Sequence, residues 1–285
     1  MKKPIALFLF SLLLFAGCAK RSTESYSINS ISLEGTRHML GQSYEIYISL
    51  SPNAANSSLE LGLFDNTDAG EEYASIILND SNPLTDGKAK IEWDVHEDGP
   101  HTLAAKLFRN GTEAASRSIS ITAYPLGLRE EDFPEVEFWH DPVERQIWQA
   151  QAFDLQASIR LRKAGFYLKY YTPPPENSTI TVELRKDSGS LPSGELIADA
   201  SIPASSLDTE FEWHFVSFPS LQLEPGRYWL ILKRPESEGT VVWRRGPGNL
   251  IGSTDDTMVS DRTQGASGAW EGKDVDFVFQ ISSQD

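Results

Sequence analysis

Residues Lys90–Thr122 read KIEWDVHEDGPHTLAAKLFRNGTEAASRSISIT and give the clearest β-strand pattern in the chain. Apolar side chains alternate with polar or small ones here, as in Leu103–Phe108, and the 3.6-residue period of a helix is absent. Residues two apart share one face of a β-strand, so this spacing predicts strands. The dipeptides Asp98-Gly99 and Asn110-Gly111 separate the apolar runs and suit tight turns that need positive φ. The stretch therefore predicts short strands joined by turns.

The same alternation continues toward the N-terminus and defines a first module over residues 25–123. Asp86-Gly87 adds one more turn signal. About seven short strands in about one hundred residues predict an immunoglobulin-like β-sandwich. The expected strands are Ser25–Leu33, Tyr44–Leu50, Leu59–Leu63, Tyr73–Leu78, Ala89–Val95, Leu103–Phe108 and Ile119–Ala123.

Toward the C-terminus, an acidic segment with three prolines covers residues 124–147 and predicts a linker followed by an edge strand, Val136–His140. Residues 148–285 return to alternation without a convincing amphipathic helix, which predicts a jelly-roll-like β-sandwich. The expected fold class is thus all-β, with two β-sandwich domains. The strands expected in the second are Trp148–Phe153, Ile159–Tyr171, Thr179–Lys186, Leu196–Ile202, Phe211–Phe218, Tyr228–Leu232, Val241–Arg244 and Val275–Ile281.

Two resemblances accompany these patterns. Lys90–Thr122, with a Trp-containing strand before His-Thr-Leu-Ala-Ala, resembles the last strands of bacterial immunoglobulin-like modules. WQAQAF (148–153), the DSGSLPSG turn (187–194), LEPGRYWLIL (223–232) and DFVFQI (276–281) resemble the choice-of-anchor, carbohydrate-module-like β-sandwiches of exported bacterial proteins. The second resemblance implies a fold and an accessory role outside the cytoplasm, and it implies no catalytic residues.

The N-terminus predicts export. Lys2 and Lys3 precede an apolar run, Ile5–Phe15, which is too short to span a bilayer and is typical of a signal peptide over residues 1–17. Phe15-Ala16-Gly17-Cys18 resembles the bacterial lipobox, with Phe15 where Leu is usual. Cys18 is the only cysteine, so an internal disulfide is impossible. The resemblance implies palmitate-type lipidation of Cys18, residues 18–24 as a tether, and, from Ala19, an outer-membrane location.

The charge of the chain limits its partners. Cleavage would remove two of the 25 basic residues and leave 23 against 41 acidic ones, a net charge of −18. Such a field repels nucleic acid and anionic lipid surfaces. The expected partners are the membrane, through the N-terminal lipid, and a glycan or a protein, with no nucleic acid.

Binding of a glycan asks for aromatic rings flanked by planar polar groups. The candidates are Tyr171, Trp243, Arg245 and Trp270; alternation places Trp243 and Arg245 on one face and Arg244 on the other. A core position for Trp243 is the alternative, and Trp148, Trp213 and Trp229 are expected in the core because they lie inside apolar strand patterns.

Metal and catalytic sites are weaker hypotheses. Asp65, Asp68 and Glu71 place oxygen ligands near a glycine turn and could bind Ca²⁺, although their spacing departs from the EF-hand loop and a solvated acidic loop is the alternative. A second candidate metal site consists of Asp94, His96, Asp98 and His101. The alternative is that these are polar residues of a hairpin that bind no metal. No other cofactor is expected. The Gly-x-Ser-x-Gly motif of a nucleophile elbow is absent.

The leading hypothesis is a non-enzymatic envelope lipoprotein in which the first sandwich is a spacer and the second binds a glycan or a protein. Two alternatives stay open: a structural component of envelope assembly, and a carbohydrate hydrolase, which needs only two suitably spaced carboxylates.

Overall fold

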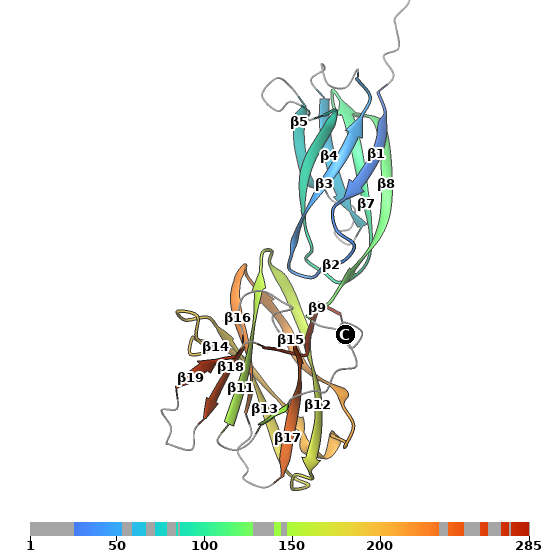
Figure 1. The fold of residues 1–285 in the computed structure, drawn as a ribbon. Coiled ribbons are helices and arrows are strands. Elements are labelled where there is room, and N and C mark those ends of the chain that lie inside the picture. The colour runs from blue at the N-terminus through green and yellow to red at the C-terminus, as the bar shows by residue number, and fades with distance from the viewer. Residues whose placement is uncertain are drawn as a thin grey trace, which may run out of the picture.

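The computed structural model describes residues 26–52, 59–66, 72–78, 84, 86–127, 140–143, 147–233, 239–247, 257–261, 269–273 and 275–284. Most of these residues lie in β-strands, which form two sandwiches placed end to end (Figure 1). None of the described segments forms a helix long and apolar enough to cross a membrane. The prediction of an all-β chain with two β-sandwiches is confirmed. Cys18 and the rest of the N-terminal export signal lie outside the described residues.

The first sandwich is built from β1 (Ile28–Leu33), β2 (His38–Met39), β3 (Ser43–Leu50), β4 (Leu59–Asp65), β5 (Glu72–Leu78), β6 (Lys88–Asp94), β7 (Gly99–Arg109) and β8 (Thr112–Tyr124). A three-stranded sheet, β1-β3-β6, packs against a five-stranded sheet, β2-β8-β7-β4-β5. Paired strands are antiparallel except β2 and β8, which run parallel. Strand β8 begins seven residues before the predicted Ile119, because the hairpin with β7 starts directly after its turn.

Two of the three predicted turns are confirmed in the first sandwich. Asn110 and Gly111 have φ of 51° and 74° between β7 and β8, and Asp86 and Gly87 have φ of 51° and 72° before β6. In the β7–β8 hairpin, positive φ at both central residues matches the twist of the flanking strands, which explains the choice of Asn-Gly. At Asp98-Gly99 the prediction holds in part: Gly99 has positive φ (117°), but it begins β7 without a tight turn, and the Asp98 side chain is buried where the two sandwiches meet.

The second sandwich is built from β9 (Leu126–Gly127), β10 (His140–Val143), β11 (Ile147–Leu155), β12 (Ile159–Thr172), β13 (Thr179–Lys186), β14 (Leu196–Pro203), the 3₁₀ turn η4 (Ala204–Ser206), β15 (Glu212–Leu223), β16 (Gly226–Lys233), β17 (Thr240–Pro247), β18 (Thr257–Asp261), β19 (Trp270–Gly272), β20 (Val275–Phe277) and β21 (Phe279–Ser282). The seven-stranded sheet has the order β10-β17-β12-β21-β9, with β15 on β12 and β20 on β17. The six-stranded sheet has the order β14-β13-β16-β11-β18-β19. The predicted edge strand Val136–His140 falls almost wholly outside the described residues.

The position of β12 organises the seven-stranded sheet. Strand β15 pairs along one of its edges, while β21 and β17 pair in succession along the other. Alternate β12 residues face the core, where Phe166 and Leu168 are fully buried. Burying side chains of this size contributes about 1.5–3 kcal/mol each to stability. The residues between them face outward, so β12 carries both the core and an outer surface.

Gly41, in the turn after β2, joins the two sandwiches. Its carbonyl accepts hydrogen bonds from the N–H groups of Gln156 (2.7 Å) and Ala157 (3.0 Å). Gly41 has φ of +75°, and an added Cβ would collide with the Leu155 side chain. Leu40, the residue before it, is fully buried in the core of the second sandwich rather than the first. The positive φ, together with the nearness of the Leu155 side chain, favours glycine at this position.

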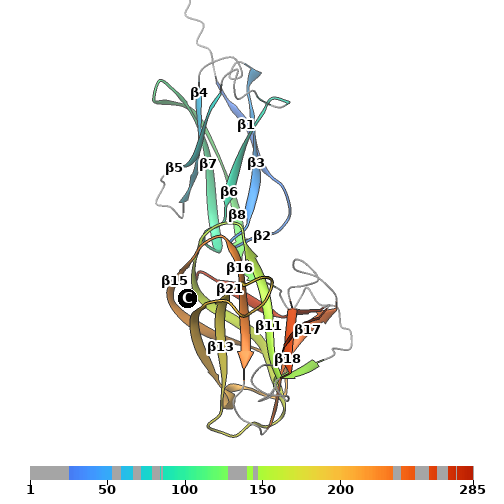
Figure 2. The same ribbon diagram turned by 90° about the vertical axis from the view of Figure 1, so that its left-hand side faces the viewer.

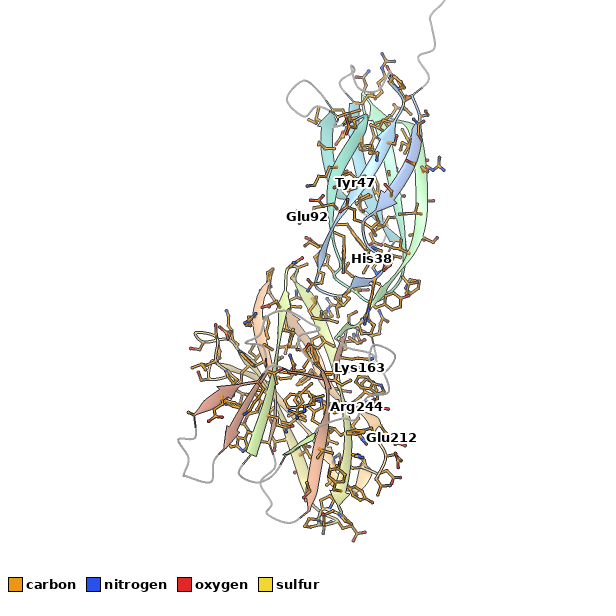
Figure 3. The ribbon with its side chains drawn as sticks, in the orientation of Figure 1. His38, Tyr47, Glu92, Lys163, Glu212 and Arg244 are labelled. Carbon is orange, nitrogen blue, oxygen red and sulfur yellow. The ribbon has the colours of Figure 1, made fainter. Side chains whose placement is uncertain are left out.

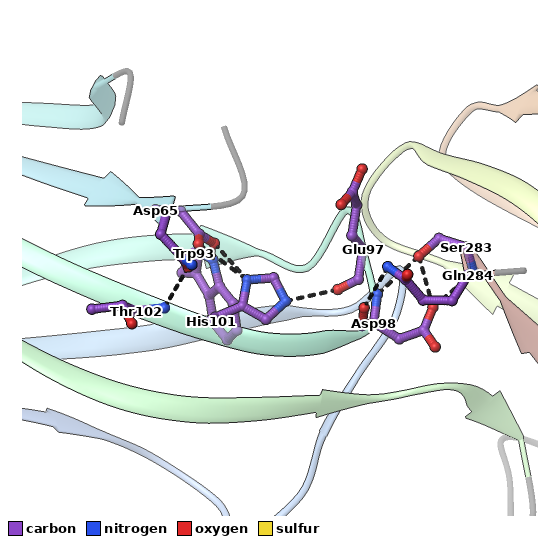
Figure 4. Close-up of polar contacts among 9 residues, drawn as sticks. Asp65, Trp93, Glu97, Asp98, His101, Thr102, Ser283 and Gln284 are labelled. Atoms are coloured by element: carbon purple, nitrogen blue, oxygen red, sulfur yellow. Dashed lines mark hydrogen bonds and ion pairs between the residues drawn. The ribbon is translucent and has the colours of Figure 1, made fainter. Parts of the chain in front are cut away.

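Asp98 provides a second connection between the sandwiches. Its carboxylate accepts hydrogen bonds from the backbone N–H and the hydroxyl of Ser283, both at 2.7 Å, and from the Ser282 hydroxyl at 3.0 Å. The Gln284 amide donates in turn to the Asp98 carbonyl at 3.0 Å (Figure 4). Both views of the ribbon place the C-terminal end of the chain at this meeting point (Figure 2). We call these contacts, with those of Gly41, the joint.

Candidate functional site

The outer surface of the seven-stranded sheet carries aromatic side chains at alternate positions. His214, Val216 and Phe218 of β15 are buried, and their neighbours Trp213 and Phe215 therefore point outward. The register sets Trp213 opposite Tyr167 and Phe215 opposite Gly165 of β12. Residues from two strands are thus brought side by side by their pairing.

Four of these rings touch in a continuous series. The ring centroids of Phe211 and Tyr167 are 5.6 Å apart, those of Tyr167 and Trp213 are 5.2 Å apart, and those of Trp213 and Phe215 are 5.9 Å apart. Phe215 is 49% exposed, whereas Tyr167 is buried against Val278 with Phe211 and Trp213 packed around it. We call Phe211, Tyr167, Trp213 and Phe215 the aromatic row. It is half-buried at one end and open to solvent at the other.

A glycine makes room for the exposed ring. A Cβ built on Gly165 would lie 2.5 Å from Cε1 and 2.9 Å from Cδ1 of Phe215. Glycine weakens a strand interior because it has no side chain to pack, and it often marks a place where another group approaches the backbone closely. The ring of Phe215 fills that place here.

Three cations lie over the rings. The Nζ atom of Lys163 is 5.3 Å from the centroid of Phe215, and that of Lys169 is 4.7 Å from the centroid of Phe211. The guanidinium carbon of Arg244 is 5.1 Å from the centroid of Tyr167. Figure 3 labels Lys163 and Arg244 along this side of the second sandwich. A cation within about 6 Å of a ring centroid is attracted by the negative face of the ring.

The acidic neighbour of the row belongs to the other side of the strand. Because successive residues of a strand face opposite sides, Glu212 lies on the same side of β15 as His214 and on the opposite side from Trp213. Burial lowers the pKa of His214, and the charge of Glu212 opposes that shift, which places the two groups close together. Within the described part of the chain, Lys163 and Lys169 form no ion pair. The outer surface is therefore locally cationic.

Tyr171 is the one predicted binding residue that lies at the aromatic row. It is 47% exposed near the end of β12, and the Nζ atom of Lys169 lies 4.9 Å from its ring centroid. Lys169 thus bridges Tyr171 and Phe211. The row with Tyr171, Lys163, Lys169 and Arg244 is the candidate site, and we call it the aromatic face.

The expectation that Trp243 contacts a ligand is wrong. Trp243 is fully buried, stacks on Phe277 with centroids 4.6 Å apart, and donates its indole N–H to the Val278 carbonyl at 2.7 Å. Alternation puts Arg245 on the same side of β17 as Trp243, facing away from the aromatic row. The predicted separation of the two arginines is correct, but Arg244, not Arg245, reaches the aromatic face.

Trp270 does not join the aromatic face either. It is half-buried on β19 at the edge of the six-stranded sheet, where it packs against the buried cluster formed by Ala150, Ala152, Trp229 and Ile231. Trp229 is buried as expected, and its indole N–H donates to Asp187 at 2.7 Å. Trp148 is only partly buried, with the Lys233 ammonium 4.1 Å from its ring centroid.

Asp187 also explains the Asp-Ser-Gly turn. Its second carboxylate oxygen accepts the Ser190 N–H at 3.0 Å, where Ser190 has φ of 61°. A Cβ on Gly194 would collide with the Lys186 carbonyl. The serines and glycines of this hairpin thus serve its backbone geometry.

Asp65 does not lie in an open acidic loop. It is 2% exposed and accepts hydrogen bonds from the Trp93 indole at 3.0 Å and from Nδ1 of His101 at 2.9 Å (Figure 4). Its other proposed calcium partners, Asp68 and Glu71, lie outside the described residues. The remaining polar residues of the 94–101 segment separate: Asp94 bonds Ser43, and His96 bonds the Ser158 carbonyl at 2.7 Å. Over the described ranges, no three His, Cys, Asp or Glu side chains gather as metal ligands would.

The signal that could have located the aromatic face is the spacing of Phe211, Trp213 and Phe215. Three aromatic residues at alternate positions occupy one face of a strand, while His214 and Val216 occupy the other. Both faces carry large side chains, so the sequence alone does not say which one is buried.

Comparisons with known proteins give the following result. No protein-family model matches the chain, and no curated protein matches it. A solved structure described as showing the promiscuous specificity of carbohydrate-binding modules from the β-sandwich superfamily aligns with 77% of this chain and 96% of its own, at 9% identity and a TM-score of 0.26. A glycosyl hydrolase family 2 member from Bacteroides cellulosilyticus aligns with 88% of this chain and 24% of its own, at 9% identity and a TM-score of 0.21. Dimeric latent PorU from Porphyromonas gingivalis aligns with 94% of this chain and 21% of its own, at 12% identity and a TM-score of 0.25. These values identify no family.

Proposed function

We propose that this chain is a non-enzymatic envelope lipoprotein whose second sandwich binds a glycan at the aromatic face. The observation that carries the proposal is the series of touching rings with cations over them on one outer sheet surface. Aromatic rings cover the apolar C–H faces of sugars, and Lys and Arg donate hydrogen bonds to sugar oxygens.

The shape of the site favours binding over catalysis. The rings lie on a sheet surface, and the charged groups over them are cations. Hydrolysis of a glycosidic bond needs two carboxyl groups flanking that bond. Glu212, next to Trp213 in the sequence, lies on the opposite side of its strand.

The first sandwich fits the role of a spacer. In the proposed arrangement Cys18 carries the lipid, residues 18–24 form the tether, and the immunoglobulin-like first sandwich holds the aromatic face away from the membrane. The joint supports this role because it fixes the second sandwich to the first through Gly41 and Asp98.

A glycan array probed with the mature protein, residues 18–285 carrying Cys18→Ser for solubility, tests the proposal. We expect binding to at least one glycan class and a loss of at least tenfold in affinity for Phe215→Ala. Leu196→Ala is the matched control, because Leu196 is also a large exposed apolar side chain (43%) but lies on β14 of the six-stranded sheet.

Trp270→Ala serves as a second control, since Trp270 lies on the six-stranded sheet. Equal losses for Phe215→Ala and Leu196→Ala would show that the contact is not at the aromatic face. A protein that binds no glycan on the array and is retained on immobilised envelope proteins would contradict the proposal in favour of a role in envelope assembly.

A further inference from the structure

We infer that the ligand of the aromatic face is an anionic polysaccharide, one whose sugars carry carboxylate or sulfate groups. This inference rests on the proposed glycan-binding function and names the class of glycan. It is drawn from the arrangement of Lys163, Lys169 and Arg244 over the rings.

The charge of the aromatic face is opposite to that of the whole protein. The chain has a formal net charge of −16, yet among the described residues the charged side chains that lie over these rings are the cations Lys163, Lys169 and Arg244. Charges in solution are screened beyond about 8–10 Å at ordinary salt, so a bound ligand is governed by the groups it touches. An acidic protein that gathers cations on this surface offers an anion a favourable place to bind there.

The cations are distributed along the row. Lys163 and Lys169 lie six residues apart on the same side of β12, which corresponds to roughly 20 Å of extended strand. Arg244 lies over Tyr167, whose ring stands in the aromatic row between the ring under Lys169 and the ring under Lys163. A single small anion would need donors that converge on one point. Cations spaced along the row instead suit a polysaccharide that carries acid groups at intervals.

The groups between the cations suit sugars. The rings of Trp213 and Phe215 offer apolar surface between the positions of Lys163 and Lys169. Gln280 of β21 pairs with Gly165 on the edge of β12 opposite Phe215, so its partly exposed side chain projects from the same outward side of the sheet. Apolar rings flanked by an amide and by ammonium groups match a chain that alternates C–H faces, hydroxyls and acid groups.

Single-stranded nucleic acid is the other polymer that uses rings and cations together. It is disfavoured here because successive bases stack on successive open rings, whereas in the aromatic row Phe215 is half exposed and Tyr167 is buried. We therefore treat nucleic acid as an outcome that the experiment must exclude.

The test compares polymers that differ only in charge. The mature protein is titrated calorimetrically with polygalacturonate and its fully methyl-esterified form, and with dextran sulfate and dextran. We expect binding to at least one anionic polymer at least tenfold tighter than to its neutral counterpart, with affinity falling as salt rises. The first pair reports carboxylate recognition and the second reports sulfate recognition.

Lys163→Gln and Lys169→Gln should each weaken binding of the anionic polymer by about fivefold, as the loss of one partly exposed charge contact does. Lys106→Gln is the matched control: the Lys106 ammonium also lies over a ring, 4.7 Å from the centroid of Phe64, but in the first sandwich. It should leave affinity unchanged.

The outcomes separate the two proposals. Equal binding of charged and neutral polymers, unaffected by either lysine change but abolished by Phe215→Ala, would overturn the inference and leave glycan binding standing. No binding of any glycan polymer would overturn both. Tighter binding of a single-stranded oligonucleotide than of either anionic polysaccharide would also overturn the inference.

Discussion

The carboxylate of Asp98, in the first sandwich, accepts hydrogen bonds from both the backbone N–H and the hydroxyl of Ser283, in the second (Figure 4). Asp98 is 6% exposed, so these bonds form away from bulk water. Residues separated by 185 positions in the sequence are thus joined at one buried carboxylate.

Asp98→Ala should therefore destabilise the joint. Removing the carboxylate leaves the Ser282 and Ser283 donors without their acceptor, and hydrogen bonds to charged groups contribute about 1.5–3 kcal/mol. We expect a loss of about 2–4 kcal/mol in the free energy of unfolding, measured by urea denaturation. Asp199→Ala, an exposed aspartate on β14, is the control and should change little. A wild-type midpoint for Asp98→Ala would refute the importance of this contact.

The buried pair of His101 and Asp65 should make stability depend on pH. Burial pulls the pKa of His101 down, but the hydrogen bond to Asp65 and its charge outweigh burial, and the pKa is raised above its usual value of 6.5. Nδ1 bonds Asp65 and Nε2 bonds the Glu97 carbonyl, an acceptor, so the protonated ring satisfies both partners.

A folded-state pKa above the unfolded one means that protonation of His101 stabilises the fold. That stability is fully present below about pH 6.5 and is lost as pH rises through the raised folded pKa. We expect the free energy of unfolding to fall over that range and the His101→Gln variant to lack this decline. His214 does not confuse the measurement, since burial lowers its pKa and confines its effect to pH below 6.5. An unchanged pH profile in His101→Gln would argue against the pair.

Gly165→Ala should disturb the aromatic face without unfolding the sheet. The new methyl group would lie 2.5 Å from Cε1 of Phe215, so the ring must move. Because Phe215 is half exposed, the ring can swing toward solvent, and we expect at least a fivefold loss of glycan affinity with a change in stability below about 1 kcal/mol.

A double-mutant cycle checks the cause of that loss. In a Phe215→Ala background, Gly165→Ala should weaken binding no further, because the displaced ring is already gone. Additive losses would mean that Gly165 acts on the ligand by another route.

Lipidation of Cys18 can be tested in cells. Radiolabelled palmitate should be incorporated into the wild-type protein, and Cys18→Ser should remove the label and release the protein from the membrane fraction. Persistence of Cys18→Ser in that fraction, with no label in the wild type, would contradict the proposed anchor.

The strands were predictable because their signal is local. Alternation in Tyr44–Leu50 or Thr179–Lys186 needs no knowledge of partners, and the positive φ at Asn110-Gly111 follows from the residue types. Strands β18 and β19 were not predicted, because Thr257–Asp261 and Trp270–Gly272 are short and lie among Gly- and Ser-rich segments.

The site was less predictable because it depends on which strands become neighbours. Trp213 and Trp243 both lie in strands with large residues on each side, and only the pairing with β12 puts Trp213 outside and Trp243 inside. For the same reason Arg244, and not the predicted Arg245, lies at the aromatic face. Asp98-Gly99 has the composition of a turn, but contact with residues near the other end of the chain gave Asp98 a different partner.

The joint also determines how the molecule responds to a pull. A load on the second sandwich reaches the first through the chain at Tyr124–Leu126, through the bonds of Gly41 and Asp98, and through the bond between His96 and the Ser158 carbonyl. These bonds come from separate points on the interface, so a pull that bends the two sandwiches apart must act on several of them. It must also withdraw the Leu40 side chain from the core of the second sandwich, where it is fully buried.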